Sequence, residues 1–214
     1  MKESTLMILD ELTHFYPALG AISDKIEDAY EALRECFSSG GRIYLCGNGG
    51  SAADCEHMVG ELLKCFRIKR PLSDGFKEIL RSFGEDGELL AEKLERGLPA
   101  ISLCGHPAFS TAFQNDNTPE LVFAQQVGAY GKEGDVLIAF STSGNSKNCV
   151  LAAICAKALD MKVVAFTGCN GGRLREISDV TVNVPERETF KIQEYHLPVY
   201  HAICAMLEEE FFGK

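Results

Sequence analysis

The chain has 214 residues, of which 46% are hydrophobic and 24% charged, and its formal net charge at pH 7 is -10. This length and composition fit one globular domain with a single large core. The negative charge argues against a nucleic-acid partner, whose phosphate backbone would be repelled, although a small phosphorylated ligand needs only local hydrogen-bond donors. No apolar run approaches the roughly 18 residues of a membrane span, so no membrane partner is expected. Asp10 and Glu11 make the N-terminus unlike a secretory signal.

The elements predicted from apolar periodicity and turn residues are, in chain order, helices 3–18 and 22–38, strand 42–46, helix 51–66, strand 99–104, helix 119–130, strand 135–140, helix 145–159, strand 162–167, a short helix after 172, strand 180–184 and a helix over about 190–212. Gly40 and Gly41 end the second helix, and Ser51 is a natural cap for the third. Pro198 is a potential kink in the last helix.

The predicted strands are rich in Val, Ile and Leu and alternate with helices. This alternation predicts an α/β fold, in which helices cover both faces of a parallel sheet. In such sheets, ligands bind beyond the carboxyl ends of the strands, near the point where the strand order reverses.

Nine cysteines are scattered along the chain without a Cys-x-x-Cys pair, and most of them stand inside apolar runs. An odd number of scattered thiols predicts reduced, buried side chains in a cytoplasmic protein. Cys46 and Cys55 flank a glycine-rich turn and are candidates for reactivity, but burial statistics favour a packing role for both.

Two turns rich in small polar residues lie at predicted strand ends. Cys46-Gly-Asn-Gly-Gly-Ser51 follows the first strand, and Ser141-Thr-Ser-Gly-Asn-Ser146 follows the third. In the second turn, the hydroxyl groups, the flexible Gly144 and the free amides of the next helix form a cradle for a phosphate group. Two such turns in one sheet suggest a sugar phosphate that is held at both ends.

Residues 70–97 interrupt the alternation of strands and helices. Two groups of apolar residues in this segment have helical spacing: Phe76, Ile79, Leu80 and Phe83, and Leu89, Leu90 and Leu94. We predict a helical excursion on the surface, which is either a lid or an oligomer contact. The alternative is a neutral insertion in a surface loop, since loops tolerate insertions at little cost.

His57 and Glu61 are four residues apart on predicted helix 51–66, which places the imidazole and the carboxylate on one face. Because this helix begins at the first glycine turn, its opening turns lie near any ligand bound there. The pair is a candidate for holding a metal or for moving a proton. The alternative is a solvated surface contact, which is the more common role of a His/Glu pair at this spacing.

The last helix and the segment after the second strand hold further candidates. Gln193 and His201 are a little over two turns apart and are expected to share a face, while His196 points about 60° away from Gln193. A lone histidine on an apolar helix is more often a satisfied core residue. Asn115 and Asp116 are expected in a loop, where such residues commonly form turns. If the second strand lies beside the first, this pair would face the pocket mouth and bind sugar hydroxyls.

A set of motifs in a fixed order carries a resemblance to a known family: Cys46-Gly-Asn-Gly-Gly-Ser51, His57 with Glu61, Asn115-Asp116, Gly134-Asp135, Ser141-Thr-Ser-Gly-Asn-Ser146, Thr167-Gly168 with Gly171-Gly172, and Ile192-Gln-Glu194 followed by His196 and His201. Together they resemble the sugar isomerase (SIS) domain family over about nine-tenths of the chain, leaving out residues 70–97. The chain looks most like the sedoheptulose 7-phosphate isomerase (phosphoheptose isomerase) branch of that family.

The resemblance implies a three-layer αβα fold around a doubly wound, five-stranded parallel sheet with flavodoxin-like strand order. It implies one SIS domain over residues 1–214, with N-terminal oligomerisation helices in 1–40, whereas the helical insertion in 70–97 is predicted from the residue pattern alone. A homotetramer with active sites between subunits is expected with it.

The resemblance also implies roles for individual residues. Glu61 and His201 would be the catalytic acid/base pair, and zinc, one ion per subunit, would be bound by His57, Glu61, Gln193 and His201. The small phosphorylated sugar would be contacted by Asn48, Gly49, Gly50, Glu61, Asn115, Asp116, Ser141, Thr142, Ser143, Ser146 and Gln193. The hydroxyl residues of the second turn would hold its phosphate.

The implied reaction converts the 2-ketose D-sedoheptulose 7-phosphate to the aldose D-glycero-D-manno-heptose 7-phosphate, for heptose-nucleotide synthesis. A carboxylate can take a proton from one carbon and return it to the next, while an imidazole moves a proton between the two oxygens. A metal or a hydrogen-bond donor would stabilise the ene-diol intermediate.

The chain departs from the family pattern in two places. The excursion at 70–97 is longer than the usual link and is expected near the sugar-binding face. Phe190 stands where some members have Asp, and Lys191 stands where Arg is usual. The aromatic side chain of Phe190 would alter the pocket for the sugar tail. Two alternatives therefore stay open. One is a non-catalytic phosphosugar- or protein-binding regulator, and the other is an isomerase or lyase of another phosphosugar, such as an amino-sugar phosphate.

Overall fold

The computed structural model describes residues 2–213, in which five short strands form one sheet in the order β2-β1-β3-β4-β5. The strands are β1 (Ile43–Cys46), β2 (Ala100–Ser102), β3 (Val136–Phe140), β4 (Lys162–Thr167) and β5 (Val180–Asn183). All four pairings between neighbours are parallel, so the carboxyl ends of the strands meet at one edge of the sheet. The predicted α/β class and flavodoxin-like strand order are confirmed.

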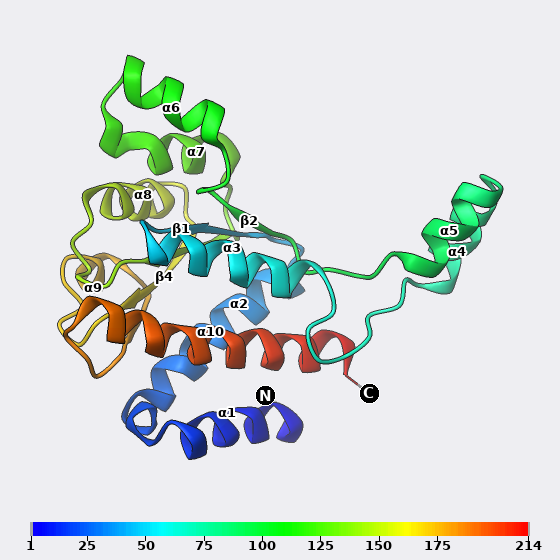
Figure 1. The fold of residues 1–214 in the computed structure, drawn as a ribbon, viewed down its shortest axis with the longest axis horizontal. Coiled ribbons are helices and arrows are strands. Elements are labelled where there is room, and N and C mark those ends of the chain that lie inside the picture. The colour runs from blue at the N-terminus through cyan, green and yellow to red at the C-terminus, as the bar shows by residue number, and fades with distance from the viewer. Residues whose placement is uncertain (1, 214) are drawn as a thin grey trace.

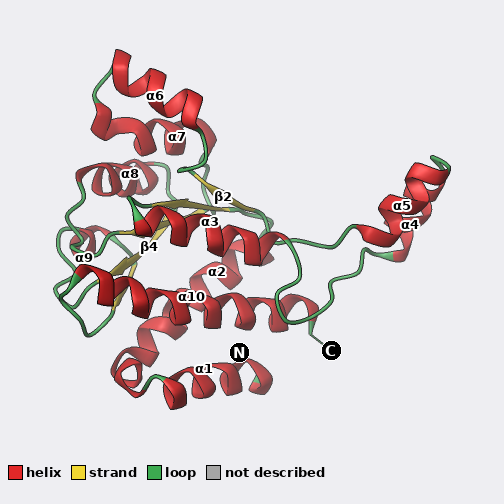
Figure 2. Cartoon of the chain, viewed as in Figure 1, coloured by secondary structure: helices red, strands yellow, loops and turns green. Residues whose placement is uncertain are grey.

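Helices cover both faces of this sheet (Figures 1 and 2). The α-helices are α1 (Glu3–Phe15), α2 (Ser23–Ser38), α3 (Gly50–Leu63), α4 (Asp74–Arg81), α5 (Glu85–Lys93), α6 (Pro107–Asp116), α7 (Val122–Tyr130), α8 (Lys147–Ala158), α9 (Leu174–Ile177) and α10 (Thr189–Phe212). Two short 3-10 helices, η1 (Pro17–Ile22) and η2 (Pro119–Leu121), precede α2 and α7. None of the helices within residues 2–213 is long and apolar enough to cross a lipid bilayer.

Two apolar cores lie on opposite sides of the sheet, because successive side chains of a strand point to opposite faces. In β1, Ile43 and Leu45 belong to the core beneath α2, α3 and α10. Tyr44 and Cys46 belong to the second core, beneath α7 and α8. Helix α1 packs outside α10 (Figure 1). The three αβα layers therefore place the start of α3, the start of α8 and the first half of α10 around the carboxyl edge of the sheet.

Prolines explain two differences from the predicted N-terminal and central helices. Helix α1 ends at Phe15 and gives way to η1, because Pro17 disfavours a helical conformation in the residue before it. The predicted helix 119–130 begins as the 3-10 turn η2, with Pro119 at its first position. Helix α10, in contrast, continues through Pro198 from Thr189 to Phe212.

Helix α6 was not predicted from the sequence, and the expectation that Asn115 and Asp116 lie in a loop is wrong. Both are at the carboxyl end of α6, which begins at Pro107. Proline at the first helical position has its backbone dihedral already set for a helix. None of the ten residues of α6 is fully buried. Its apolar face is short, consisting mainly of Phe109 and Phe113, which pack against the edge of the second core.

Residues 70–97 form a hairpin of two short helices, α4 and α5, that stands away from the body of the molecule (Figure 1). The chain enters this segment from the end of α3 and leaves it into the first residue of β2, Ala100. The amino end of a parallel strand is opposite to the edge where the glycine turns lie. The expectation that the excursion lies near the sugar-binding face of its own chain is therefore wrong.

Candidate active site

The first glycine turn is formed where the fully buried strand β1 ends and α3 begins. Gly49 has a φ of 57°, a conformation that side chains with a Cβ rarely adopt. A Cβ on Gly50 would come within 2.8 Å of the Gln193 side chain, so glycine is required for α10 to approach this closely. The turn therefore brings the amino end of α3 and the Gln193 amide together.

The second turn follows β3 and begins with a buried hydroxyl. Ser141 Oγ donates to Ser146 Oγ at 2.9 Å and also accepts from the Ser146 amide at 3.4 Å. Gly144 has a φ of 66° and packs against the backbone of Gly171. Thr142 and Ser143 are more exposed than Ser141. Neutral hydroxyl donors and the first amides of α8 therefore share one concave turn, which suits an anion.

An amide pair joins the two turns. Asn48 Nδ2 donates to Asn148 Oδ1 at 3.0 Å, and Asn148 Nδ2 donates to Asn48 Oδ1 at 2.8 Å. Strands β1 and β3 are neighbours, so the two turns form one continuous polar surface at the carboxyl edge of the sheet. The sequence analysis identified Asn48 but missed Asn148, which lies on α8 just after the second turn.

Helices α3 and α10 run side by side and bring the predicted acid/base residues together (Figure 1). His57 Nε2 lies 3.4 Å from Glu61 Oε1, and the ring centroids of His57 and His201 are 4.9 Å apart at 90°. The His201 Nε2 atom is buried and has no hydrogen-bond partner within residues 2–213. Burial lowers the pKa of His201, and the neighbouring His57 lowers it further. His201 is therefore a neutral imidazole near pH 7.

Two residues that the sequence analysis missed lie behind His57. The Tyr200 hydroxyl is 2.9 Å from His57 Nδ1 and donates to Asp54 Oδ1 at 3.4 Å. Burial raises the pKa of Asp54 to about 6 and raises that of Tyr200 as well. Tyr200 thus remains a phenol that orients the His57 ring. In the sequence, Tyr200 could have been found because it is adjacent to His201. Asp54 could have been found because it lies one helical turn before His57.

The residues expected to bind zinc are only partly brought together. His57 lies beside both Glu61 and His201, whereas Gln193 lies against Gly50 at the first turn, roughly 12 Å along the helix axis from His201. Within residues 2–213, no three His, Cys, Asp or Glu side chains are grouped so as to hold a metal ion. The unpartnered Nε2 atom of His201 beside a second imidazole and a carboxylate nevertheless fits the donor chemistry that zinc prefers.

His196, the weaker candidate on the last helix, is a core residue. It is fully buried, its ring packs edge-on against both Phe140 and Phe166, and its Nε2 is 3.3 Å from the Thr167 carbonyl oxygen. Burial lowers the pKa of His196 to about 4, which keeps the ring neutral.

The structure of one chain does not bring Asn115 and Asp116 to the other site residues. Both side chains are exposed, and Asn115 Nδ2 donates to Asp116 Oδ1 at 2.8 Å. Helix α6 lies beyond α7, on the opposite side of the sheet from α10 (Figure 1). Any contact of this pair with a sugar held between the two turns requires another subunit or a movement of α6.

Four thiols, those of Cys46, Cys55, Cys104 and Cys149, gather beneath the two turns. Cys46 and Cys55 are fully buried, which confirms their predicted packing role. Cys104 Sγ donates to the Gly47 carbonyl oxygen at 3.4 Å. A hydrogen bond from the Cys55 thiol lowers the pKa of Cys104 to about 7. All nine cysteines are free thiols; five of them are buried, as predicted, and Cys65, Cys104, Cys155 and Cys169 are partly exposed.

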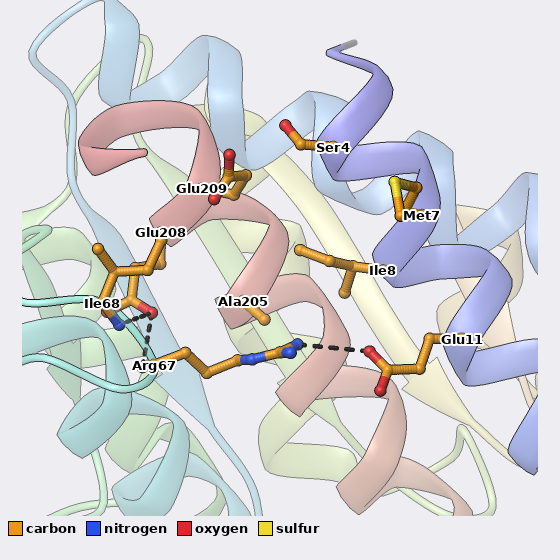
Figure 3. Close-up of a pocket in the computed structure, with 9 residues that line it drawn as sticks. All are labelled: Ser4, Met7, Ile8, Glu11, Arg67, Ile68, Ala205, Glu208 and Glu209. Carbon is orange, nitrogen blue, oxygen red and sulfur yellow. Dashed lines mark hydrogen bonds and ion pairs between the residues drawn. The ribbon is translucent and has the colours of Figure 1, made fainter. Parts of the chain in front are cut away.

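A hollow of about 520 Å³ between α1 and the end of α10 is lined by none of the candidate site residues (Figure 3), although it adjoins a smaller hollow that His201 lines. Its walls include Met7 and Ile8 of α1, and an ion pair between Arg67 and Glu11 spans it at 3.6 Å. The Glu208 carboxylate at its edge already accepts hydrogen bonds from the Arg67 and Ile68 amides. This carboxylate is structural, and the hollow has no acid/base pair like that of α3 and α10.

The fold, the two polar turns and the histidine–carboxylate group define a sugar-phosphate-binding α/β protein of the SIS class. The sequence signature of the SIS domain matches residues 18–97 and 90–168. The chain is 40% identical to a phosphoheptose isomerase of Burkholderia pseudomallei over 190 residues, which covers 89% of this chain and 82% of that protein. It is 36% identical to the phosphoheptose isomerase of Shewanella loihica over 212 residues, which covers 96% of this chain and 95% of that protein.

A solved structure of a phosphoheptose isomerase from Francisella tularensis superposes with a TM-score of 0.73 at 30% identity, covering 97% of this chain and 94% of that one. One from Neisseria gonorrhoeae superposes with a TM-score of 0.69 at 33% identity, covering 91% of this chain and 96% of that one. The chain belongs to the phosphoheptose isomerase family of SIS domain proteins, and the predicted resemblance is confirmed.

Proposed function

We propose that this protein is an aldose–ketose isomerase that converts D-sedoheptulose 7-phosphate to D-glycero-D-manno-heptose 7-phosphate for heptose-nucleotide synthesis. The observation that carries this proposal is the meeting of two helices. Glu61 of α3 and His201 of α10 both lie against His57, on the helices that border the first polar turn. A protein that only bound the phosphosugar would need the turns but not a partly buried imidazole beside a carboxylate.

The polar turns position the substrate in this proposal. Ser141, Thr142, Ser143 and Ser146 hold the phosphate through their hydroxyls and the first amides of α8. Asn48, Gly49, Gly50 and Gln193 contact the sugar at the first turn, where the Gly49 backbone has open space around it and Gly50 lies against the Gln193 side chain. A sugar anchored in this way presents its C1 and C2 atoms at a fixed distance from the phosphate, which restricts the geometry of proton transfer.

Glu61 takes the proton from C1 and returns it to C2, and His201 moves a proton between the two oxygens. The Glu61 side chain is mostly buried, at 13% exposure, which limits competition from water. The lowered pKa of His201 leaves its Nε2 able to accept a proton at pH 7. Tyr200 holds the His57 ring through Nδ1, so that Nε2 of His57 faces Glu61.

We further propose that one zinc ion per subunit is bound by His57, Glu61, His201 and Gln193, and that it stabilises negative charge on the substrate oxygens when bound. The unpartnered His201 nitrogen supports this proposal. Metal analysis of the purified protein is expected to give about one zinc per chain. His201→Gln is expected to lower that content, and equal zinc in both proteins would contradict the assignment.

A homotetramer with active sites between subunits is part of the proposal, because a second subunit can supply the Asn115–Asp116 pair that one chain holds away from the turns. We place the protein in the cytoplasm, which is supported by nine cysteines that remain free thiols although four of them lie together.

The test is an assay of purified protein with sedoheptulose 7-phosphate, other ketose phosphates and an amino-sugar phosphate, with zinc supplied. We expect aldoheptose phosphate from sedoheptulose 7-phosphate at the highest kcat/KM. Glu61→Gln is expected to abolish turnover and retain substrate binding, whereas Glu56→Gln, an exposed carboxylate on the same helix, retains activity. Binding without turnover of any substrate would favour a regulator, and preference for another sugar would reassign the substrate.

A further inference from the structure

The α4–α5 hairpin carries an apolar stripe that nothing in its own chain covers. All eight residues of α4 remain at least partly exposed. The stripe consists of Phe76 (46% exposed), Ile79 (61%), Phe83 (74%), Leu90 (42%) and Leu94 (44%). Phe76, Ile79 and Phe83 have the spacing of one face of α4 and its carboxyl end, and Leu90 and Leu94 have the spacing of one face of α5, so both helices of the hairpin expose apolar side chains.

The contacts within the hairpin bury too little apolar surface to hold two such helices in water. Isolated helices shorter than about 12–15 residues are marginal, and α4 and α5 have eight and nine. Gly87 packs against the Leu80 carbonyl and Ala91 is buried, but these are small side chains. The one ion pair between the helices, Arg81–Glu88, is about half exposed and adds little. A folded hairpin therefore implies a surface that covers the stripe.

The root of the hairpin is rigid, which favours a fixed docking arm over a moving lid. Arg70 and Glu208 form an ion pair at 2.8 Å, with both side chains fully buried. The two chains of the root are joined by the Pro71–Glu95 bridge and by a hydrogen bond of 2.8 Å from the Arg96 amide to the Arg70 carbonyl. A lid needs a hinge that absorbs backbone rotation, and these contacts hold the backbone in place.

The position of the hairpin also excludes its own polar turns as the docking surface. Figures 1 and 2 show it projecting from the edge of the sheet where the strands begin, away from the starts of α3 and α8. At its root lies a hollow of about 540 Å³ lined by apolar residues that include Phe37, Leu72, Phe76, Phe211 and Phe212. The exposed stripe therefore continues into a concave apolar surface.

We propose that the hairpin is an oligomerisation arm whose stripe packs against the same stripe of a second copy of this chain. In a two-fold pairing of antiparallel arms, Ile79 lies near the axis, and Phe83 at the tip of one arm reaches the hollow at the root of the other. The five side chains expose about 500 Å² of apolar surface per copy. Two copies bury about 1,000 Å², which is the lower limit for a specific interface.

This contact is separate from the expected interface of the N-terminal helices, so its removal leaves a smaller oligomer. The test is sedimentation velocity of the full chain over a range of concentrations. Ile79→Glu/Phe83→Glu is expected to halve the mass of the wild-type oligomer and to weaken the association by at least about 100-fold. Ile154→Glu, which places the same charge on the exposed face of α8, is the matched control and keeps the wild-type mass.

A monomeric wild type, or a double variant with the wild-type mass, would overturn the proposal. A double variant with a raised KM and the wild-type mass would identify the hairpin as a lid, which would also overturn the proposal. If the double variant does not fold, replacing residues 74–93 by a short Gly/Ser linker gives the same test, since the root is held by its own hydrogen bonds. Hydrogen exchange of the α4 amides is expected to slow as wild-type concentration rises. The mass measurement does not depend on isomerase activity, so an inactive protein that still pairs leaves this proposal intact.

Discussion

Replacing Glu208 by glutamine is expected to destabilise the protein more than any exchange of an exposed charge. The Glu208 carboxylate is fully buried at the junction of α3, α10 and the root of the arm. It accepts hydrogen bonds of 2.7–3.0 Å from the backbone amides of Phe66, Arg67 and Ile68. It also accepts one of 2.8 Å from Arg70 Nε. Arg70 in turn donates to the carbonyl oxygens of the last turn of α3.

Glutamine has nearly the same shape as glutamate, but its NH₂ end cannot accept these hydrogen bonds, and the Arg70 guanidinium is left buried without a countercharge. Breaking one side of a buried ion pair costs about 3–5 kcal/mol. That is a large share of the roughly 5–15 kcal/mol by which a domain is stable. For a domain of this size the melting temperature should fall by about 10 °C or more.

The assay is urea unfolding followed by circular dichroism, with thermal melts in parallel. Glu88→Gln is the control, because it removes one side of an ion pair that is about half exposed. It should change the free energy of unfolding by no more than about 1 kcal/mol. The apolar double variant Arg70→Met/Glu208→Leu should be more stable than Glu208→Gln, since no buried charge is left unpaired. A loss below about 1 kcal/mol for Glu208→Gln would refute the reasoning.

Three further predictions concern single side chains. Tyr200→Phe removes the hydroxyl that lies 2.9 Å from His57 Nδ1, so it should lower kcat/KM by about tenfold while folding is unchanged. A kcat/KM equal to that of the wild type would contradict the orienting role of Tyr200. Because the pKa of Cys104 is lowered to about 7, the rate at which Cys104 is alkylated should level off above pH 7, while Cys46 stays unreactive. An alkylation rate of Cys104 that still rises at high pH would contradict the lowered pKa. The pKa of His196 is about 4 in the folded protein, below its value of about 6.5 in the unfolded chain. As the pH falls from 6.5 towards 4, the unfolded chain therefore takes up a proton at His196 before the folded protein does, and the folded protein loses stability. Relative to His196→Gln, the wild type should lose about 2 kcal/mol of unfolding free energy between pH 7 and pH 5, and parallel pH profiles would contradict this.

Most of the sheet and its ligand-binding edge could be predicted from the sequence, because parallel strands buried on both faces are continuous apolar runs. The turns after β1 and β3 were identifiable for a related reason. Glycines that must adopt a positive φ, such as Gly49 and Gly144, are visible in a sequence as clusters among small polar residues.

What could not be predicted depends on tertiary contact or on its absence. Helix α6 has no fully buried residue, and its apolar face is limited mainly to Phe109 and Phe113. The Asn48–Asn148 pair joins residues 100 positions apart, and no local pattern indicates it. Tyr200 was hidden in an apolar helix, where an aromatic residue usually packs in the core. The helical spacing of Gln193 and His201 was visible, but only the structure shows that Gln193 lies against Gly50 while His201 lies against His57.

The measurement that tests proton transfer by Glu61 most directly is isomerisation of sedoheptulose 7-phosphate in deuterium oxide, followed by NMR. Transfer through an ene-diol predicts that wild-type protein introduces solvent deuterium at C2 of the aldose, and that Glu61→Gln binds the substrate but neither isomerises nor labels it. Isomerisation and labelling by Glu61→Gln at the wild-type rate would contradict the assignment of Glu61 as the proton carrier.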